Sequence, residues 1–377
     1  MSLRTVVCLN IITLICFLST LLYILFPNVF TPTLDATLTG VNKNVVQTRE
    51  NIARTVSTTA SKPPLSRKMK ADNSTKNQIN KHYTFRDFQK SVCVKRFKPA
   101  ENSVYHEEKK PCPTKGIVTI VPVGRTGNQM WEYSSIWSIA KNTGLQPYLP
   151  LCLKLKLEEV FEKMPFPSLE AIADCPFNPN SAVDSSAKLS KTKQNIIIPR
   201  AKFYIDESRP YLKEIVKEFR FKREFVDYAQ STLRELKSKL PPKHYTFIGV
   251  HVRRTDYVNY LKTSYHSKPA TSQYFQNAMN YFKKKFSNCI FIYVSDDPTW
   301  CFNQFGNLKD VFVPSYKTNS SAADDLALMA ACNHTIFDYG TFGEWGAILA
   351  GGHAIFYNGK RNQPRRTQKF KNWIMMK

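Results

Sequence analysis

The sequence predicts an α/β protein made of two doubly wound domains with a cleft between them, preceded by a membrane anchor and a flexible stem. Three observations lead to this prediction: an uncharged apolar run near the amino terminus, a polar stretch after it, and strand patterns that alternate with helical patterns from residue 116 onward. Such alternation is typical of parallel sheets, which bind ligands at the carboxyl ends of their strands.

Residues 6–26 form the predicted transmembrane anchor, because none of these side chains is charged. A helix of this length spans about 30 Å, the thickness of a bilayer core. Arg4 precedes the run and the next basic residue is Lys43, so residues 1–5 are expected in the cytosol. The alternative is a cleaved signal peptide, whose apolar core is usually about 7 to 15 residues long and ends in a small-residue cleavage site. No such site follows here, and we expect a type II signal anchor.

Residues 27–115 are expected to form a stem in the secretory lumen. No Phe, Trp or Tyr lies between Phe30 and Tyr83, so this stretch cannot bury enough apolar surface to offset its chain entropy. A homodimer would be held through the anchor or the stem. Acceptor patterns for N-glycosylation occur at Asn73, Asn319 and Asn333. The third borders an apolar run, where burial would leave it unmodified.

Composition points to an anionic partner. The chain has 54 Lys and Arg against 29 Asp and Glu, a formal net charge of +25. Such a balance suits a phosphorylated small molecule, an acidic surface or a nucleic acid. The expected lumenal topology and the lack of a nucleic-acid-binding motif argue against nucleic acid.

Seven of the nine cysteines remain for the lumen once Cys8 and Cys16 are assigned to the anchor. An odd number leaves at least one thiol free, buried or paired between chains. Cys152 and Cys175 flank one segment and form the predicted intrachain disulfide. No CxxC motif or Cys/His cluster has the spacing of a zinc site, so no metal is expected.

The two domains are predicted at residues 116–243 and 244–360, joined near Pro241, with a basic tail over residues 361–377. In the first domain, a β-branched strand precedes a glycine-containing turn and a helix with apolar residues at helical spacing. In the second, short apolar runs predict strands and the stretches between them predict helices. The expected strands are 117–121, 247–252, 290–294, 311–313, 335–337 and 354–357, and the clearest helices are 273–286 and 323–331.

The densest polar cluster follows the strand at 247–252, where His251, Arg253, Arg254 and Asp256 enter a loop at the edge of the sheet. Alternation places His251 and Arg253 on one face of the strand, so both can enter one site. Guanidinium groups bind phosphate oxygens in bidentate pairs, and two of them can neutralise a leaving diphosphate. The alternative is a surface salt bridge between Arg254 and Asp256.

A glycine-containing turn follows the first strand. Gly124 and Gly127 permit a tight turn with close backbone approach, and the next helix offers its positive end to an anion. The pattern is neither GxGxxG nor a Walker A loop, so a dinucleotide dehydrogenase and a P-loop NTPase are not supported. The alternative is an ordinary strand-to-helix turn, the commoner reason for such a glycine pair.

Two later strands also end in polar groups. Asp296 and Asp297 follow the strand at 290–294, where a carboxylate can accept the paired N–H groups of a guanine edge or serve as a helix N-cap. The backbone amides of residues 340–346 and the Thr341 hydroxyl can hold phosphate.

Together these motifs resemble the alpha-1,2-fucosyltransferase family. Four motifs carry the resemblance: HVRRTDY at 251–257, GRTGNQM at 124–130, CNHTI at 332–336 and GTFGEWGAILAGG at 340–352. It implies a GT-B-like fold of two Rossmann-like domains and an inverting transfer of L-fucose from GDP-β-L-fucose to a galactose 2-hydroxyl. It also implies a Golgi membrane address, a galactose-containing glycan as acceptor, and no cofactor or obligatory metal. Residues 154–222 match poorly, and acceptor choice is expected there.

The resemblance also implies roles for individual residues. Arg253 would bind the β-phosphate with support from Arg254, and Asn128 would lie near the leaving oxygen. Asp297 would read guanine. The further donor contacts implied are His251, Thr341, Phe342, Gly343 and Gly127. The general base stays open between Asp256, Glu344 and no strong base at all.

Two other functions fit the same pattern. One is a catalytically inactive protein that binds GDP-fucose or glycans, and the intact Arg253, Arg254 and Asn128 argue against it. The other is a protein O-fucosyltransferase, from which the type of acceptor would distinguish this chain.

Overall fold

The computed structural model describes residues 83–93, 105–178, 194–316, 320–359 and 370–377. The predicted anchor, the stem up to residue 82 and the sequons at Asn73 and Asn319 lie outside these ranges. Within them, no helix combines the length and the apolar character needed to cross a bilayer. Asn333 of the third sequon is exposed rather than buried, and its amide oxygen accepts a 2.8 Å hydrogen bond from the Phe247 N–H.

The carboxyl-terminal half is built on a sheet of six parallel strands in the order β6-β5-β4-β7-β8-β9. These strands are β4 (Thr246–Val252), β5 (Cys289–Ser295), β6 (Val311–Phe312), β7 (His334–Phe337), β8 (Ala354–Tyr357) and β9 (Trp373–Met376). The strands predicted here from apolar runs are confirmed. The sequence assigned β9 to a basic tail, but β9 pairs with β8 along its whole length.

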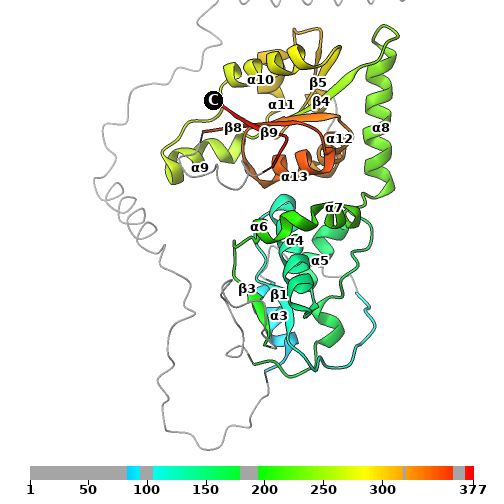
Figure 1. Ribbon diagram of the computed structural model, residues 1–377, viewed down its shortest axis with the longest axis vertical. Helices are drawn as coiled ribbons and strands as arrows, with labels where there is room; N and C mark the ends of the chain where they lie inside the picture. The colour runs from blue at the N-terminus through cyan, green and yellow to red at the C-terminus, as the bar shows by residue number, and fades with distance from the viewer. Residues whose placement is uncertain (1–82, 94–104, 179–193, 317–319, 360–369) are drawn as a thin grey trace, which may run out of the picture. The chain divides into compact units, whose positions relative to one another are not determined.

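Helices cover both faces of this sheet, as a doubly wound fold requires (Figure 1). They are α8 (Arg223–Ser238), α9 (Thr255–Tyr265), α10 (Ser272–Lys285), α11 (Pro298–Phe305), α12 (Ala322–Ala330) and α13 (Gly340–Ala350). Phe275 and Phe282 of α10 pack against one face of β4 and β5. Leu236 of α8 and Leu328 of α12 belong to the cluster on the other face. Because α8 packs with this half, the boundary between the halves lies before residue 223 rather than at 243.

The amino-terminal half has a smaller sheet of three parallel strands in the order β2-β1-β3. Its strands are β1 (Ile117–Ile120), β2 (Gln146–Pro147) and β3 (Ile196–Ile198), and its helices are α3 (Phe85–Val92), α4 (Thr126–Thr143), α5 (Leu151–Glu158), α6 (Ile205–Ser208) and α7 (Leu212–Ile215). Short 3₁₀ helices occur at Leu169–Ile172, Arg209–Tyr211, Val216–Glu218 and, in the other half, Pro314–Tyr316.

Helix α4 joins the two halves, because it packs against both β1 and α13. Most of its side chains are buried. The ring centroids of Trp131 on α4 and Trp345 on α13 lie 4.8 Å apart, so the halves share part of one apolar core.

Residues 83–93 and 105–115 belong to the folded part, although the sequence assigned them to the stem. Phe85 of α3 is buried in a cluster with residues of β1. The Lys154 ammonium is almost fully buried and lies 2.9 Å from the Glu107 carboxylate. These contacts place residues 83–93 and 105–115 in the folded part, so the stem predicted over residues 27–115 does not extend to residue 115.

Two disulfides tie this leading segment to the amino-terminal half: Cys93–Cys152 and Cys112–Cys175. The predicted Cys152–Cys175 bridge is therefore wrong. Nearness in sequence suggested it, but each of these cysteines faces a partner in the segment before β1. The other described cysteines, Cys289, Cys301 and Cys332, are buried free thiols.

Replacing both Cys112 and Cys175 with Ser should lower the free energy of unfolding by about 2–4 kcal/mol, because the bridge closes a long loop in the unfolded chain. Urea denaturation of the variant and the wild-type protein measures this change. Peptide mapping without reduction should link Cys112 to Cys175 and Cys93 to Cys152. A peptide that joins Cys152 to Cys175 would contradict the structure.

Candidate active site

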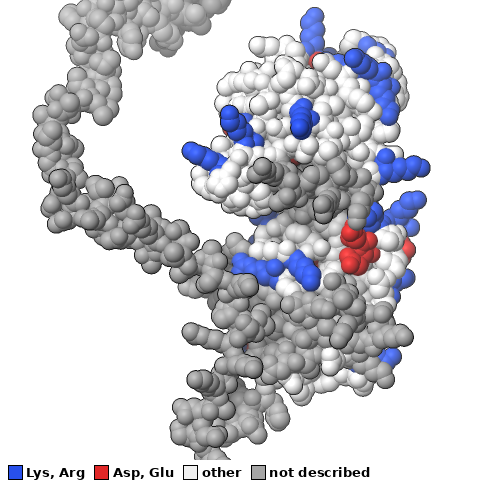
Figure 2. All heavy atoms as spheres, turned by 60° about the vertical axis from the view of Figure 1, so that its left-hand side comes forward, with Lys and Arg blue, Asp and Glu red and all other residues white. Residues whose placement is uncertain are grey.

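A pocket of about 1190 Å³ lies at the carboxyl ends of the strands and is lined by residues of both halves. The first turns of α4, α9, α12 and α13 contribute Gly127, Asp256, Ala322 and Thr341 to the lining. Helix amino ends carry partial positive charge and unpaired N–H groups, so several of them around one pocket favour an anionic ligand. Basic side chains are spread over the visible surface (Figure 2). Of the described Lys and Arg residues, only Arg125 and Arg253 line the pocket.

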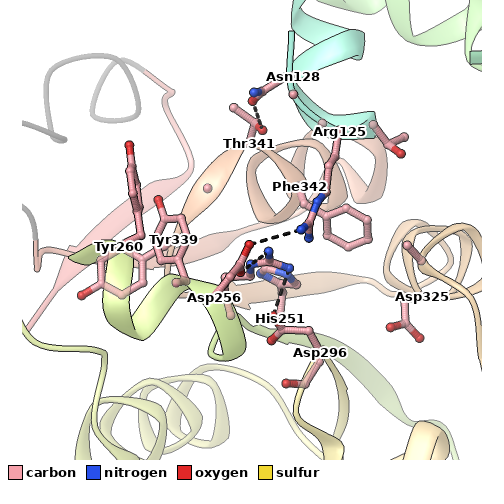
Figure 3. Close-up of a pocket in the computed structure, with 18 of the residues that line it drawn as sticks. Arg125, Asn128, His251, Asp256, Tyr260, Asp296, Asp325, Tyr339, Thr341 and Phe342 are labelled. Atoms are coloured by element: carbon pink, nitrogen blue, oxygen red, sulfur yellow. Dashed lines mark hydrogen bonds and ion pairs between the residues drawn. The ribbon is translucent and has the colours of Figure 1, made fainter. Parts of the chain in front are cut away.

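The turn between β1 and α4 depends on two glycines. Gly124 has φ +83°, and a Cβ there would lie 2.0 Å from the Asn128 amide nitrogen. A Cβ on Gly127 would lie 2.6 Å from the backbone nitrogen of Phe342. The amino ends of α4 and α13 therefore meet, and the Thr341 hydroxyl donates a 2.7 Å hydrogen bond to the Asn128 side-chain oxygen (Figure 3). The expected donor residues Gly127, Asn128, Thr341 and Phe342 all line the pocket.

Arg253 lies in the pocket between two carboxylates. Its Nη2 lies 2.5 Å from Asp256 Oδ1, and its Nη1 lies 3.0 Å from Asp296 Oδ2. Arg125 reaches across from α4, with Nη2 3.2 Å from Asp256 Oδ2. Both arginines of the pocket are therefore paired with carboxylates.

A buried acid holds the backbone of Arg253 in place. The Asp338 carboxylate, which follows β7 directly, accepts hydrogen bonds from the N–H groups of Arg253 at 2.9 Å and Tyr339 at 2.6 Å. His251 Nδ1 lies 3.7 Å from the same carboxylate. Burial raises the pKa of Asp338 to about 8 and lowers the pKa of His251 to about 4. At neutral pH both groups are therefore mainly uncharged.

Arg254 and Asp297 do not line the pocket. The Arg254 guanidinium lies 4.1 Å from the ring centroid of Trp300, and its Nε is 3.5 Å from Asp297. The Asp297 carboxylate accepts a 3.0 Å hydrogen bond from the backbone N–H of Trp300 and so caps the amino end of α11. Of the two sequence interpretations of Asp297, the N-cap is the one that the structure supports. Arg254 supports the site indirectly, because its backbone N–H donates a 2.8 Å hydrogen bond to the Asp296 carboxylate.

Glu344 is wrong as a candidate base. Its side chain is buried outside the pocket, where it accepts a 3.0 Å hydrogen bond from the Trp131 indole. Gly343 also lies behind the pocket: a Cβ there would lie 3.0 Å from His251 Nδ1. A Cβ on Gly343 would also lie 2.7 Å from Phe337 Cβ, so the glycine lets both Phe337 and His251 pack closely. The adjacent Phe342 lines the pocket and places its ring 5.1 Å from the imidazole.

The sequence interpretation missed Asp325, in the first turn of α12. Its carboxylate lines the pocket and accepts a 3.0 Å hydrogen bond from the Ser320 hydroxyl. Burial raises the pKa of Asp325 to about 7. The only signal in the sequence was an Asp pair behind a Ser N-cap, which also suits an ordinary helix start. Among the described residues, no three metal-ligating side chains lie together.

The Asp338→Asn variant tests the buried acid. Because the pKa of Asp338 in the folded protein is raised to about 8, the folded protein holds this proton more tightly than the unfolded chain, where an Asp titrates near 3.9. Raising the pH from about 5 to 7 should therefore lower the free energy of unfolding of the wild-type protein, whereas the variant should not show this decrease. Their difference in unfolding free energy should change by about 1.4 kcal/mol per pH unit. Urea titrations across this range measure it, and a constant difference would mean that Asp338 titrates normally.

Comparisons with known proteins identify the family of this chain. The model of glycosyl transferase family 11 matches residues 79–377. Galactoside alpha-(1,2)-fucosyltransferase 2 from Mus musculus is 31% identical over 249 residues, which cover 64% of this chain and 71% of that protein. Galactoside 2-alpha-L-fucosyltransferase Sec1 from Mus musculus is 30% identical over 251 residues, or 65% of this chain and 67% of that protein.

Fucosyltransferase NodZ from Bradyrhizobium, a solved structure, is 19% identical and covers 63% of this chain and 94% of its own, with a TM-score of 0.41. That score is too low for its site to be compared with this one. The family match includes every residue that the structure describes, and with it both glycine-dependent helix ends and Arg253. The chain therefore belongs to glycosyl transferase family 11.

Proposed function

We propose that the protein is an inverting α-1,2-fucosyltransferase, which moves L-fucose from GDP-β-L-fucose to the 2-hydroxyl of a terminal galactose on a glycan. Membership of family 11 and the activity named in its relatives support this function. The observation that carries it is the position of Arg253, whose guanidinium lines a pocket surrounded by helix amino ends. That arrangement suits a diphosphate as leaving group.

The donor would occupy the part of the pocket between Arg253 and Asp325. Its β-phosphate would bind Arg253 and the amide end of α13 beside Thr341. A carboxylate accepts the paired N–H groups of guanine well, and Asp325 lines the pocket whereas Asp297 does not. Asp325 forms no ion pair with any described Lys or Arg, so its oxygens suit this role better than those of Asp256 or Asp296. We therefore reassign guanine recognition from Asp297 to Asp325.

In the reaction, the bond between fucose C1 and the β-phosphate oxygen breaks, and GDP keeps the electron pair. Positive charge grows at C1 while negative charge grows on the diphosphate, beside the fixed charge of Arg253. The galactose 2-oxygen bonds to the opposite face of C1, which inverts its configuration, and its proton must pass to a base.

Asp256 is the remaining carboxylate candidate for that base. It lies in the first turn of α9, lines the pocket and keeps 56% of its side chain exposed. Its two oxygens pair with Arg253 and Arg125. A diphosphate that binds Arg253 would release one of these oxygens, so the base would become available when the donor arrives.

We extend the proposal to the cell. The uncharged residues 6–26 and the polar stretch after them support a single-pass type II protein of the Golgi membrane with its pocket in the lumen. A pocket between two α/β halves also agrees with a GT-B-like arrangement.

Replacing Arg253 with Ala should lower kcat about 10²- to 10³-fold, or about 3–4 kcal/mol, because the leaving diphosphate loses its fixed positive charge. The matched control is Arg223→Ala, since the Arg223 side chain is 86% exposed and, among the described residues, forms an ion pair with Asp227 alone, on its own helix. Steady-state kinetics of both variants measure the effect. Near-normal turnover of the Arg253→Ala variant would remove this residue from catalysis.

The decisive assay incubates the full chain in detergent with GDP-fucose and EDTA, in parallel with galactose-terminated glycans and with folded protein domains. Linkage analysis of the product should find fucose on the galactose 2-hydroxyl. Fucose on a serine or threonine of a folded domain would instead establish a protein O-fucosyltransferase. Binding of GDP-fucose without transfer to either class would favour an inactive binder, and no binding at all would overturn the proposal.

A further inference from the structure

The pocket has a second, chemically different side, formed by four tyrosines that we call the tyrosine wall. Tyr257, Tyr260 and Tyr265 come from α9 and Tyr339 follows β7; all four line the pocket. Neighbouring ring centroids lie 5.2 Å apart for Tyr257 and Tyr260, and 5.4 Å apart for Tyr257 with Tyr339 and for Tyr260 with Tyr265. The rings therefore form one continuous aromatic surface.

This surface is partly exposed but firmly anchored. Tyr260 and Tyr265 are 42% and 37% exposed. Tyr339, at the inner end, is fully buried and donates a 2.8 Å hydrogen bond to the Lys268 carbonyl. Leu261 of the same helix is also fully buried. Rigid, exposed aromatic rings in a pocket provide a large contact area at a low cost in conformational entropy, which is typical of a binding surface rather than of a core.

The chemistry of the wall suits an uncharged ligand. The Tyr260 and Tyr265 hydroxyls lie 3.2 Å apart, and this hydrogen bond raises the pKa of Tyr260 to about 12. The Tyr260 phenol is therefore neutral at physiological pH. A hexose presents a face of C–H groups that packs on the electron-rich face of an aromatic ring, and its hydroxyls can hydrogen-bond to phenol oxygens at the edge.

The wall and the proposed guanine position lie on opposite sides of the catalytic groups. Figure 3 shows Tyr260 and Tyr339 on one side of Asp256 and His251, and Asp325 on the other. Asp256 and Tyr260 are four residues apart on α9, so their side chains lie on the same face of the helix, one turn apart. A sugar stacked on Tyr260 would therefore lie beside the candidate base.

We propose that the tyrosine wall is the acceptor subsite, where a β-galactoside stacks on Tyr260 with its 2-hydroxyl directed at Asp256. This inference rests on the proposed function. It moves acceptor recognition away from residues 154–222, where the sequence suggested it. Of the described residues in that span, only Ala201 and Phe203 line the pocket.

The test measures the binding of two probes separately. N-acetyllactosamine is titrated by NMR in the presence of GDP, and GDP alone is titrated by calorimetry, on the full chain in detergent. Tyr260→Ala should weaken the binding of N-acetyllactosamine about three- to tenfold through the lost ring contact, with an unchanged Kd for GDP. Tyr260→Phe, which keeps the ring, should retain most of the affinity.

Tyr316→Ala is the matched control, because Tyr316 is 43% exposed, stacks on Phe302 and does not line the pocket. It should change neither affinity. An unchanged Kd for GDP would also show that the pocket of the Tyr260→Ala variant is folded. Tyr265→Ala provides a second test, because it should weaken the binding of N-acetyllactosamine in the same way as Tyr260→Ala.

Weaker GDP binding by Tyr260→Ala, with N-acetyllactosamine binding intact, would mean that the wall stacks the nucleobase and would overturn the inference. Unchanged affinities for both probes, or no N-acetyllactosamine binding by the wild-type protein, would overturn it as well. Fucose transfer is assayed independently. A wild-type protein that binds N-acetyllactosamine through Tyr260 but transfers no fucose would contradict the proposed function and still support the subsite.

Discussion

The close approach of α4 to α13 at Gly127 is the constraint on which the site depends. Only a hydrogen fits there, because a Cβ would meet the backbone of Thr341 and Phe342 at 2.6 Å. The amino ends of two helices from different halves therefore face the same space. Behind them, the rings of Trp131 and Trp345 pack into the shared core. The contact between α4 and α13 therefore both joins the halves and forms the anion-binding side of the pocket, so a change in this contact would alter both.

The second principle of the site is an exchange of charges. Asp256 and Asp296 pair with Arg253, and burial shifts the pKa values of Asp338 and His251 toward their uncharged forms. A diphosphate would take the place of Asp256 on the arginine, so donor binding would free a carboxylate on the side where the tyrosine wall begins. The net charge of +25 contributes little, since most basic side chains lie elsewhere.

The sequence predicted the carboxyl-terminal sheet well, because β4 and β5 are buried apolar runs bounded by polar turns. Gly127, Arg253 and Thr341, which the sequence also singled out, line the pocket because strand ends and helix starts in parallel folds converge on one edge. Asn128, which also lines it, was singled out only by the family resemblance. Sequence-based prediction failed where the spacing of residues does not determine the direction in which a side chain points. The neighbours Asp296 and Asp297 differ only in which enters the pocket, and Glu344 lies on the inward face of α13.

Other features needed tertiary contacts that no local pattern contains. Asp325 precedes β7 on a helix rather than following a strand, so the strand-end rule did not reveal it. Pairing of Cys93 with Cys152 requires residues 83–93 to pack against the rest of the amino-terminal half. The apolar side chain of Phe85 alone did not predict this packing. The tyrosine wall joins α9 to Tyr339, 74 residues beyond Tyr265 in the chain.

The most direct test of the account is a crystal structure of the protein with GDP bound. The β-phosphate should lie within about 3 Å of the Arg253 guanidinium and guanine against Asp325. Asp256 should be released from Arg253, and the tyrosine wall should be unoccupied. A guanine ring stacked on Tyr260, or a diphosphate bound away from Arg253, would contradict it.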